Sequence, residues 1–138
     1  MTYADDTPMR DVLAGMAGVD AEACQEFARR QAATGHGADL AVAAALLHDL
    51  AFAAQLDRPD ELMRWKDPET QSPLDPEQLM TLLQHCSEKR RDDAGTLIAG
   101  MSFADISALS SIASYLAQAC AQLRRFGTRP PDPQQSLF

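Results

Sequence analysis

Two pairs of adjacent side chains in this sequence could do chemistry: His48 with Asp49, and His85 with Cys86. Imidazoles, carboxylates and thiols are the groups that most often move protons, hold metals or attack electrophiles. A nucleophilic Cys86 would need the imidazole of His85 beside it, but neighbouring residues on a helix point about 100° apart. No Asn or Asp partner is specified either, so we interpret Cys86 as a core residue and His85 as a surface residue. Glycine-rich phosphate loops, G-x-S-x-G elbows and H-E-x-x-H helices are absent from the sequence, which therefore specifies no catalytic constellation.

The stretch "AAALLHDLA" around His48 and Asp49 resembles the central helix of the HD-domain metal-dependent phosphohydrolases. The resemblance covers about one helix, and it implies a divalent metal held by this pair, a His from an earlier helix and an Asp from a later one. His36 and Asp105 are the available candidates. On one continuous helix, His36 and His48 would lie about 18 Å apart along the axis, so His36 could join only if the chain turns sharply at residues 35–37. The alternative, which we favour, is a His48 hydrogen-bonded inside a helical core, with Asp49 at the surface or paired with it and no cofactor.

The last five residues carry a different signal: Gln134, Gln135, Ser136, Leu137 and Phe138. They resemble the pentapeptide by which many bacterial replication and repair proteins dock on the ring-shaped sliding clamp of the replicative polymerase. Four of the five positions match, and Gln135 stands where Leu is commoner. The resemblance implies that Leu137 and Phe138 fill a hydrophobic cleft of the clamp, that Gln134 makes amide hydrogen bonds, and that Ser136 is a small polar spacer.

The segment before this pentapeptide is rich in proline and has no helical periodicity, so we expect residues 128–138 to form an extended, disordered tail. One alternative is that Leu137 and Phe138 fold back onto the body or onto a neighbouring copy. Another is a tail like those of single-stranded-DNA-binding proteins, which end in Phe after an acidic run. Only Asp132 precedes the motif here.

Charge is distributed unevenly along the chain, whose net charge is −8. Residues 1–80 carry six basic and fifteen acidic side chains, whereas residues 81–138 carry six basic and five acidic ones. An acidic body repels phosphate backbones, so independent binding to duplex DNA is not expected. The basic cluster in "EKRRDD", residues 88–93, is interpreted as solvated charge at a helix end rather than as a phosphate contact.

Cysteine usage and hydropathy predict a cytoplasmic protein that does not span a membrane. The three cysteines are widely spaced and form no C-x-x-C pair, so we expect free, buried thiols. The N-terminus has no basic region followed by an apolar block, as a secretory signal would. The most apolar stretch, residues 38–56, is interrupted by Asp39, His48 and Asp49, and we interpret it as a buried helix.

The pattern of apolar residues predicts an all-α domain over residues 1–127. A composition of 46% hydrophobic but only 6% aromatic residues suits a compact bundle of close-packed helices. We expect five to six helices around a central apolar helix at 38–56, with residues 91–100 either prolonging the preceding helix through a kink at Gly95 or forming a short helix of their own. The other helices are predicted to begin at capping signals at Thr7, Asp20, Asp75 and Ser102 and at Pro59.

Together these patterns favour a non-catalytic accessory or regulatory protein that docks on the bacterial sliding clamp in DNA replication or repair, whether chromosomal, plasmid or phage. Its helical body would be free to bind a second protein. Two other hypotheses stay open: an HD-type phosphohydrolase that uses His36, His48, Asp49 and Asp105, and a helical protein that self-associates through its apolar faces.

Overall fold

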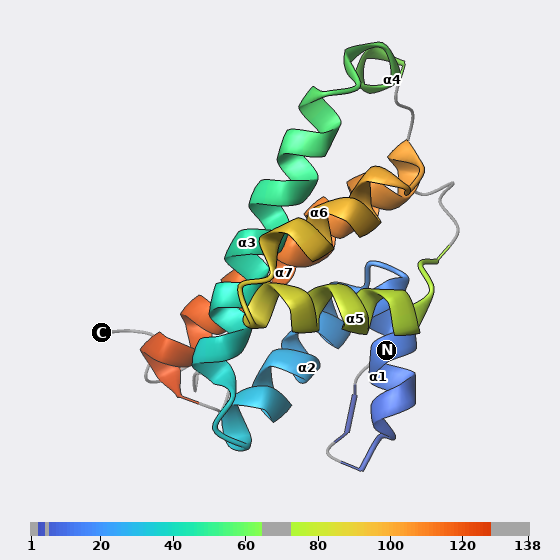
Figure 1. Ribbon diagram of the computed structural model, residues 1–138. Helices are drawn as coiled ribbons and strands as arrows, with labels where there is room; N and C mark the ends of the chain where they lie inside the picture. Colours follow the sequence, from blue (N-terminus) through green and yellow to red (C-terminus); the bar gives the residue numbers. More distant parts are fainter. Residues whose placement is uncertain (1–2, 5, 65–72, 128–138) are drawn as a thin grey trace.

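The computed structural model describes residues 3–4, 6–64 and 73–127, and this part of the chain is all-α, as predicted. This described part of the chain has no β-strand between its helices (Figure 1). Seven helices are present in the described ranges: α1 (Met9–Ala17), α2 (Ala21–Ala33), α3 (Gly37–Leu56), α4 (Pro59–Met63), α5 (Pro76–Ser87), α6 (Arg91–Ala99) and α7 (Phe103–Phe126).

The segment whose structure the sequence left open forms a separate helix, α6. The break lies at Lys89, which takes a φ of 61°, and not at Gly95. The N–H of Arg90 then donates to the carbonyl oxygen of His85 at 2.8 Å, which satisfies a carbonyl at the end of α5. The count is therefore seven helices where the sequence predicted five to six.

Side-chain caps fix the beginnings of three helices as predicted. Carboxylate oxygens of Asp20 and Asp75 accept from the N–H groups two residues later, and the Ser102 hydroxyl accepts from the N–H of Asp105 at 3.2 Å. The cap predicted at Thr7 was wrong. Pro8 occupies the cap position of α1 and makes no side-chain cap bond, because the Thr7 hydroxyl accepts from the N–H of Ala4 instead.

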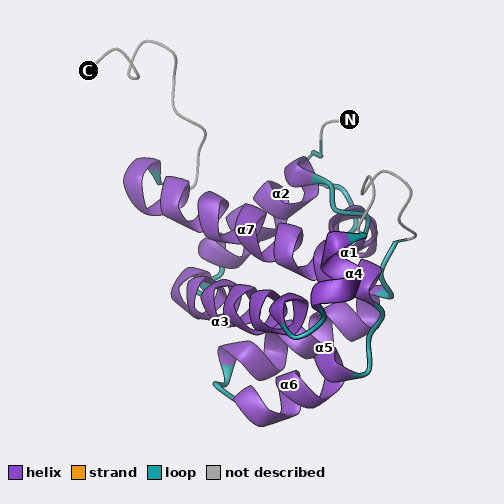
Figure 2. Ribbon diagram, turned by 90° about the horizontal axis from the view of Figure 1, so that it is seen from above, coloured by secondary structure: helices purple, strands orange, loops and turns teal. Residues whose placement is uncertain are grey.

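The helices pack in layers, with α3 in the middle. Seen from above, α3 lies between α1, α2 and α7 on one side and α5 and α6 on the other (Figure 2). Helix α7 is the most deeply buried helix, because ten of its residues face the core. The largest fully buried side chains include Met16 of α1, Leu47 of α3, Leu82 of α5 and Leu109 of α7, so every layer contributes to one core.

Helix α3 occupies the predicted central position, but it is not enclosed on all sides. Its buried residues, Leu40, Ala43, Ala44, Leu47 and Ala51, share one face, and the opposite face is open to solvent. Among the described helices, α3 alone is long and apolar enough to cross a membrane by length and composition. The core helix of a soluble protein passes the same test, and α2, α4, α5, α6 and α7 all pack against α3.

Candidate functional site

The residues of the alternative metal set are spread over α3 and α7: three are exposed and Asp105 is half-buried. His36 lies at the N-cap of α3, where its Nδ1 is 3.7 Å from a carboxylate oxygen of Asp39. His48 and Asp49 lie at the middle of α3, and Asp105 lies in the first turn of α7. The described residues contain no group of three or more His, Cys, Asp or Glu side chains that could hold a metal ion. The structure therefore does not bring these four side chains together.

The turn at residues 35–37 does not bring His36 towards His48. Gly35 takes a φ of 85° and turns the chain sharply, but the turn ends before His36, which is already the cap of α3. The two histidines thus lie on one helix and are separated by about 18 Å along its axis.

His48 is exposed, which corrects the prediction that it lies in the core. Its ring stacks against Phe52, one turn further along α3, with ring centroids 6.3 Å apart and ring planes at 5°. Phe52 is itself 51% exposed. The sequence could not locate His48 because α3 is apolar around most of its circumference and gives no periodic signal for its buried face.

The pentapeptide Gln134, Gln135, Ser136, Leu137 and Phe138 lies outside the described residues, as does the whole predicted tail at 128–138. The described chain ends where α7 ends. Gly127 takes the positive φ of 82° that suits a helix terminus, and its N–H donates to the carbonyl oxygen of Leu123 at 2.8 Å.

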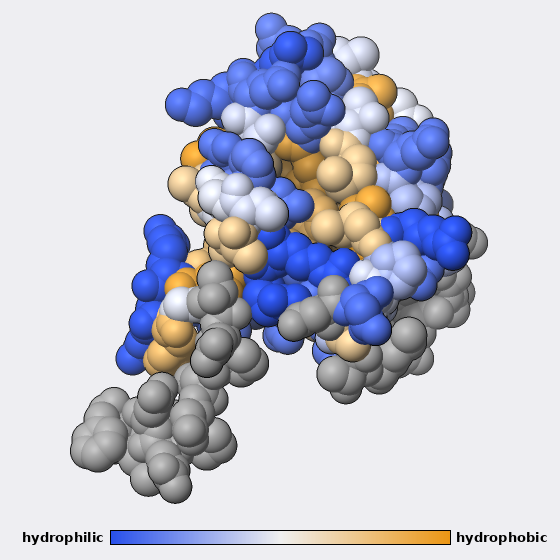
Figure 3. Space-filling model, turned by 90° about the horizontal axis from the view of Figure 1, so that it is seen from below, coloured by the Kyte–Doolittle hydropathy of each residue, from blue (hydrophilic) through white to orange (hydrophobic). Residues whose placement is uncertain are grey.

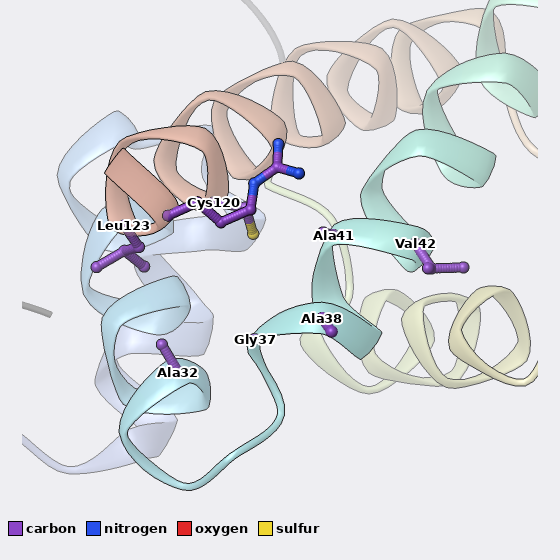
Figure 4. A pocket seen from close by; sticks show the side chains of 8 residues that line it. Ala32, Gly37, Ala38, Ala41, Val42, Cys120 and Leu123 are labelled. Atoms are coloured by element: carbon purple, nitrogen blue, oxygen red, sulfur yellow. The ribbon is translucent and has the colours of Figure 1, made fainter. Parts of the chain in front are cut away.

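A cavity of about 420 Å³ lies beside the C-terminal end of α7, between α2, α3 and α7 (Figure 4). Small residues at the α2–α3 connection leave this space open, because a Cβ on Gly37 would already approach Ala32 to 3.4 Å. The cavity walls are mostly apolar, and Arg124 is the one cationic side chain among them. Such walls can hold apolar groups but supply no acid–base pair. No sequence pattern predicts this cavity, because it is formed by residues of three different helices.

A second cavity of about 300 Å³ lies between α2, α3 and α5. Phe27, Leu40, Met80 and Leu83 line it, and His36 and Asp39 lie at the same end of α3. Viewed from below, the molecule shows a hydrophobic area bordered by hydrophilic side chains (Figure 3). This end of the bundle therefore exposes more apolar surface than its acidic composition suggests.

The three cysteines are free and buried, as predicted. Burial, with a smaller contribution from the carboxylate of Asp20, raises the pKa of Cys24 to about 12. Burial alone raises the pKa of Cys86 to about 11. For Cys120, burial again raises the pKa, although Arg124 acts in the opposite direction. Thiols with raised pKa values are poor nucleophiles, which argues against cysteine chemistry at these positions.

His85 is half-buried rather than a surface residue, and its Nδ1 has no hydrogen-bond partner among the described residues. Cys86 next to it is fully buried, as predicted. No Asn or Asp partner orients the imidazole, so the pair lacks the third member that an activated nucleophile requires.

A buried ion cluster on α2 holds the N-terminal segment in place. Glu26 is only 8% exposed, and it accepts hydrogen bonds from Arg29 at 2.6 and 3.0 Å and from Arg30. Arg30 also donates to the carbonyl oxygens of Thr7 and Ala4. Burial raises the pKa of Glu26, but the hydrogen bonds and charges of the two arginines outweigh that effect and lower it. The cluster is structural, because its charges are satisfied within the bundle.

No family model, curated protein or solved structure matches this chain. The fold class is therefore established by the structure alone, and both family resemblances stay predictions.

Proposed function

We propose that the protein is a non-catalytic accessory or regulatory protein that docks on the bacterial DNA sliding clamp through residues 134–138. The observation that carries this proposal is the sequence "QQSLF", which matches the clamp-binding pentapeptide at four of five positions. Leu137 and Phe138 are the apolar anchors, and Gln134 supplies the amide that fixes the register.

The physics of short-peptide recognition supports this assignment. A short peptide gains most of its affinity from a few apolar side chains that enter a preformed pocket on the partner. Proline-rich sequence before the anchors lowers the conformational entropy that binding removes. The sequence "RPPDP" occupies that position in this chain.

The helical body favours a binding role over a catalytic one. Its described helices assemble neither the metal set that includes His48 and Asp49 nor an activated thiol at Cys86. The acidic excess of residues 1–80 repels the phosphate backbone of DNA. Recruitment to a replication or repair site is then best served by contact with a protein, such as the clamp.

A binding titration of the full chain against a bacterial sliding clamp tests the proposal. We expect saturable binding that the Leu137→Ala/Phe138→Ala double variant loses, while its helical circular dichroism stays the same. Equal binding by both proteins, or binding by neither, would contradict the proposal.

Position 135 offers a matched control within the same five residues. Because Leu is commoner than Gln there, we expect Gln135→Leu to tighten binding and Gln135→Ala to leave it nearly unchanged. Gln134→Ala should weaken binding, since it removes the register-fixing amide. If Gln135→Ala abolished binding while Gln134→Ala did not, the tail would bind in another register and the proposed assignment would fail.

A further inference from the structure

The open face of α3 carries a regular stripe of exposed residues. Its members are spaced alternately by four and three positions: Ala38, Val42, Ala45, Asp49, Phe52 and Leu56. Val42, Phe52 and Leu56 are 42%, 51% and 55% exposed, which is unusual for large apolar side chains on a core helix. A spacing of four and three is the one by which one helix packs along another.

The sizes of these residues are graded along the helix. The N-terminal half of the stripe has the smaller side chains, Ala38, Val42 and Ala45, and the C-terminal half has the large ones, Phe52 and Leu56. Two parallel copies would place large residues against large ones and small against small. An antiparallel pair places each large residue against a smaller one.

We propose that this face is a homodimer interface in which two copies of α3 pair antiparallel about a twofold axis near Leu47. In this register Val42 of one copy lies opposite Phe52 of the other, and Ala38 lies opposite Leu56. Such an interface is isologous, so one patch satisfies both copies at once.

Charge at the two ends of α3 agrees with the antiparallel direction. The C-terminal end continues into exposed carboxylates, Asp57, Asp60 and Glu61. At the N-terminal end, Arg124 of α7 lines the same cavity as Ala38 and Val42. Antiparallel pairing places this arginine near the acidic end of the second copy, whereas parallel pairing would place like charges together.

The other charged groups near these ends reduce that pattern without reversing it, because the three carboxylates at the C-terminal end outnumber the two arginines there, Arg58 and Arg64. Arg58 donates to the carbonyl oxygens of Met101 and Ala99, so its guanidinium is directed onto the bundle. Arg64 donates to the carbonyl oxygen of Asp60. Asp39, an exposed carboxylate at the N-terminal end, lines the cavity between α2, α3 and α5 and not the one that Arg124 lines.

The same register gives the conspicuous pair at the centre of α3 a role. His48 and Asp49 lie one and two residues beyond the twofold axis, so His48 of one copy lies about 4.5 Å along the helix axis from Asp49 of the other, and the two Asp49 residues lie about 6 Å apart along it. A hydrogen bond from this imidazole would satisfy the carboxylate, which sits within the stripe, and would offset the approach of the two Asp49 side chains. A lipid surface would leave this carboxylate unpartnered, and an acidic chain is repelled by anionic lipids.

The size of the face sets the expected affinity. A helix of 20 residues is about 30 Å long and about 10 Å wide, a projected area of roughly 300 Å² per copy. Stable interfaces bury about 800 Å² per partner, so a dimer through this face alone should be weak.

Sedimentation velocity of the full chain between about 1 and 300 μM tests the proposal. We expect a monomer–dimer equilibrium that Phe52→Glu shifts at least tenfold towards monomer. Met9→Lys, on the exposed side of α1, is the matched control and should dimerise like the wild type. The Leu137→Ala/Phe138→Ala variant should also dimerise, which separates this interface from self-association through the tail.

A charge pair tests the antiparallel register itself. In Val42→Lys/Phe52→Glu, each introduced lysine faces the glutamate introduced at position 52 of the other copy, so we expect dimerisation to return relative to Phe52→Glu alone. No recovery would overturn the register, because a parallel pair would place like charges opposite each other. A wild type that stays monomeric at 300 μM, or a dimer insensitive to Phe52→Glu, would overturn the interface. Binding of the wild type to vesicles of phosphatidylcholine and phosphatidylglycerol, lost in Phe52→Glu, would assign the face to a membrane instead.

Discussion

Helices α3 and α7 are the two longest described helices, and they pack against each other. They differ in the kind of residue that each exposes to solvent. Helix α7 has a buried stripe of ten residues and polar residues on its remaining face. Helix α3 is apolar around most of its circumference, but only five of its twenty residues are buried. Apolar composition therefore does not measure burial here. Helix α3 thus exposes an apolar face that no described helix covers, and the proposed dimer would cover it.

The two proposals combine into one arrangement. A dimer through α3 would carry two copies of residues 134–138, and the sliding clamp that the motif implies is a ring with two or three equivalent clefts. Two tails on one dimer raise the effective concentration of the second tail after the first has bound. A weak dimer and a short motif would then together give tight, reversible docking.

Thiol labelling should separate the core of the bundle from the open face of α3 by the largest factor. Cys24 and Cys86 are buried, and burial raises the pKa of each, so labelling of these two thiols requires local or global opening, whereas Cys120 lines the cavity beside α7. An Ala45→Cys variant adds one exposed thiol on the open face. At low protein concentration we expect this thiol to react at least about 1,000-fold faster than Cys24 and Cys86, which corresponds to opening free energies above about 4 kcal/mol.

Ellman's reagent under native conditions measures these rates, with single-cysteine variants to assign each one. Comparable rates for position 45 and Cys24 would contradict the described burial. Slower labelling at position 45 as protein concentration rises would add support for the interface.

Truncation in the core of α7 should produce the largest loss of stability. Leu109 is fully buried, and Leu109→Ala should lower the free energy of unfolding by about 3 kcal/mol through lost burial and a cavity. Urea denaturation followed by circular dichroism measures this change. A loss below about 1 kcal/mol would mean that the α3–α7 contact is looser than described.

The ion cluster on α2 should show an intermediate and pH-dependent effect. Glu26→Gln removes a buried carboxylate that two arginines stabilise, and we expect a loss of about 1–2 kcal/mol at neutral pH. Because the folded pKa of Glu26 is lowered, its stabilisation is present above the ordinary glutamate pKa near 4.5 and is lost as the pH falls through the folded value. The stabilities of wild type and variant should therefore converge in acid.

Asp49→Asn is the matched control, since it neutralises an exposed carboxylate on α3. It should change the unfolding free energy of the monomer by less than about 0.5 kcal/mol at any pH. A pH-independent difference between wild type and Glu26→Gln would contradict the role given to the cluster.

The sequence predicted the features that depend on neighbouring residues. Caps at Asp20, Asp75 and Ser102 and the helix end at Gly127 follow from local hydrogen-bonding chemistry, and the described residues show all of them. The Thr7 cap failed because Ala4, equally close in the sequence, competes for its hydroxyl.

Features that depend on distant residues were not predictable. The bonds from Arg30 to Thr7 and Ala4 join segments more than twenty residues apart. The cavity beside the C-terminal end of α7 is lined by residues of three helices, α2, α3 and α7. The exposure of His48 depends on which face of α3 its neighbours cover, and a helix with an almost uniform apolar pattern does not encode that choice.

The smallest loss of monomer stability should come from substitution on the open face of α3. A small loss would show that this face does not belong to the core of the monomer. Phe52 has the size of a core residue but is half exposed, so Phe52→Ala forfeits little buried area beyond its stack with His48. We expect a loss of less than about 0.5 kcal/mol at protein concentrations below the dimer dissociation constant, against about 3 kcal/mol for Leu109→Ala. At concentrations above the dimer dissociation constant, the midpoint of wild-type unfolding should rise with concentration while that of Phe52→Ala rises less. Urea midpoints of wild type and Phe52→Ala at 1 and 200 μM measure both the stability loss and its dependence on protein concentration. A concentration-independent loss of several kcal/mol would place Phe52 in the core of the monomer. Helix α3 would then not differ from α7 in exposing an apolar face.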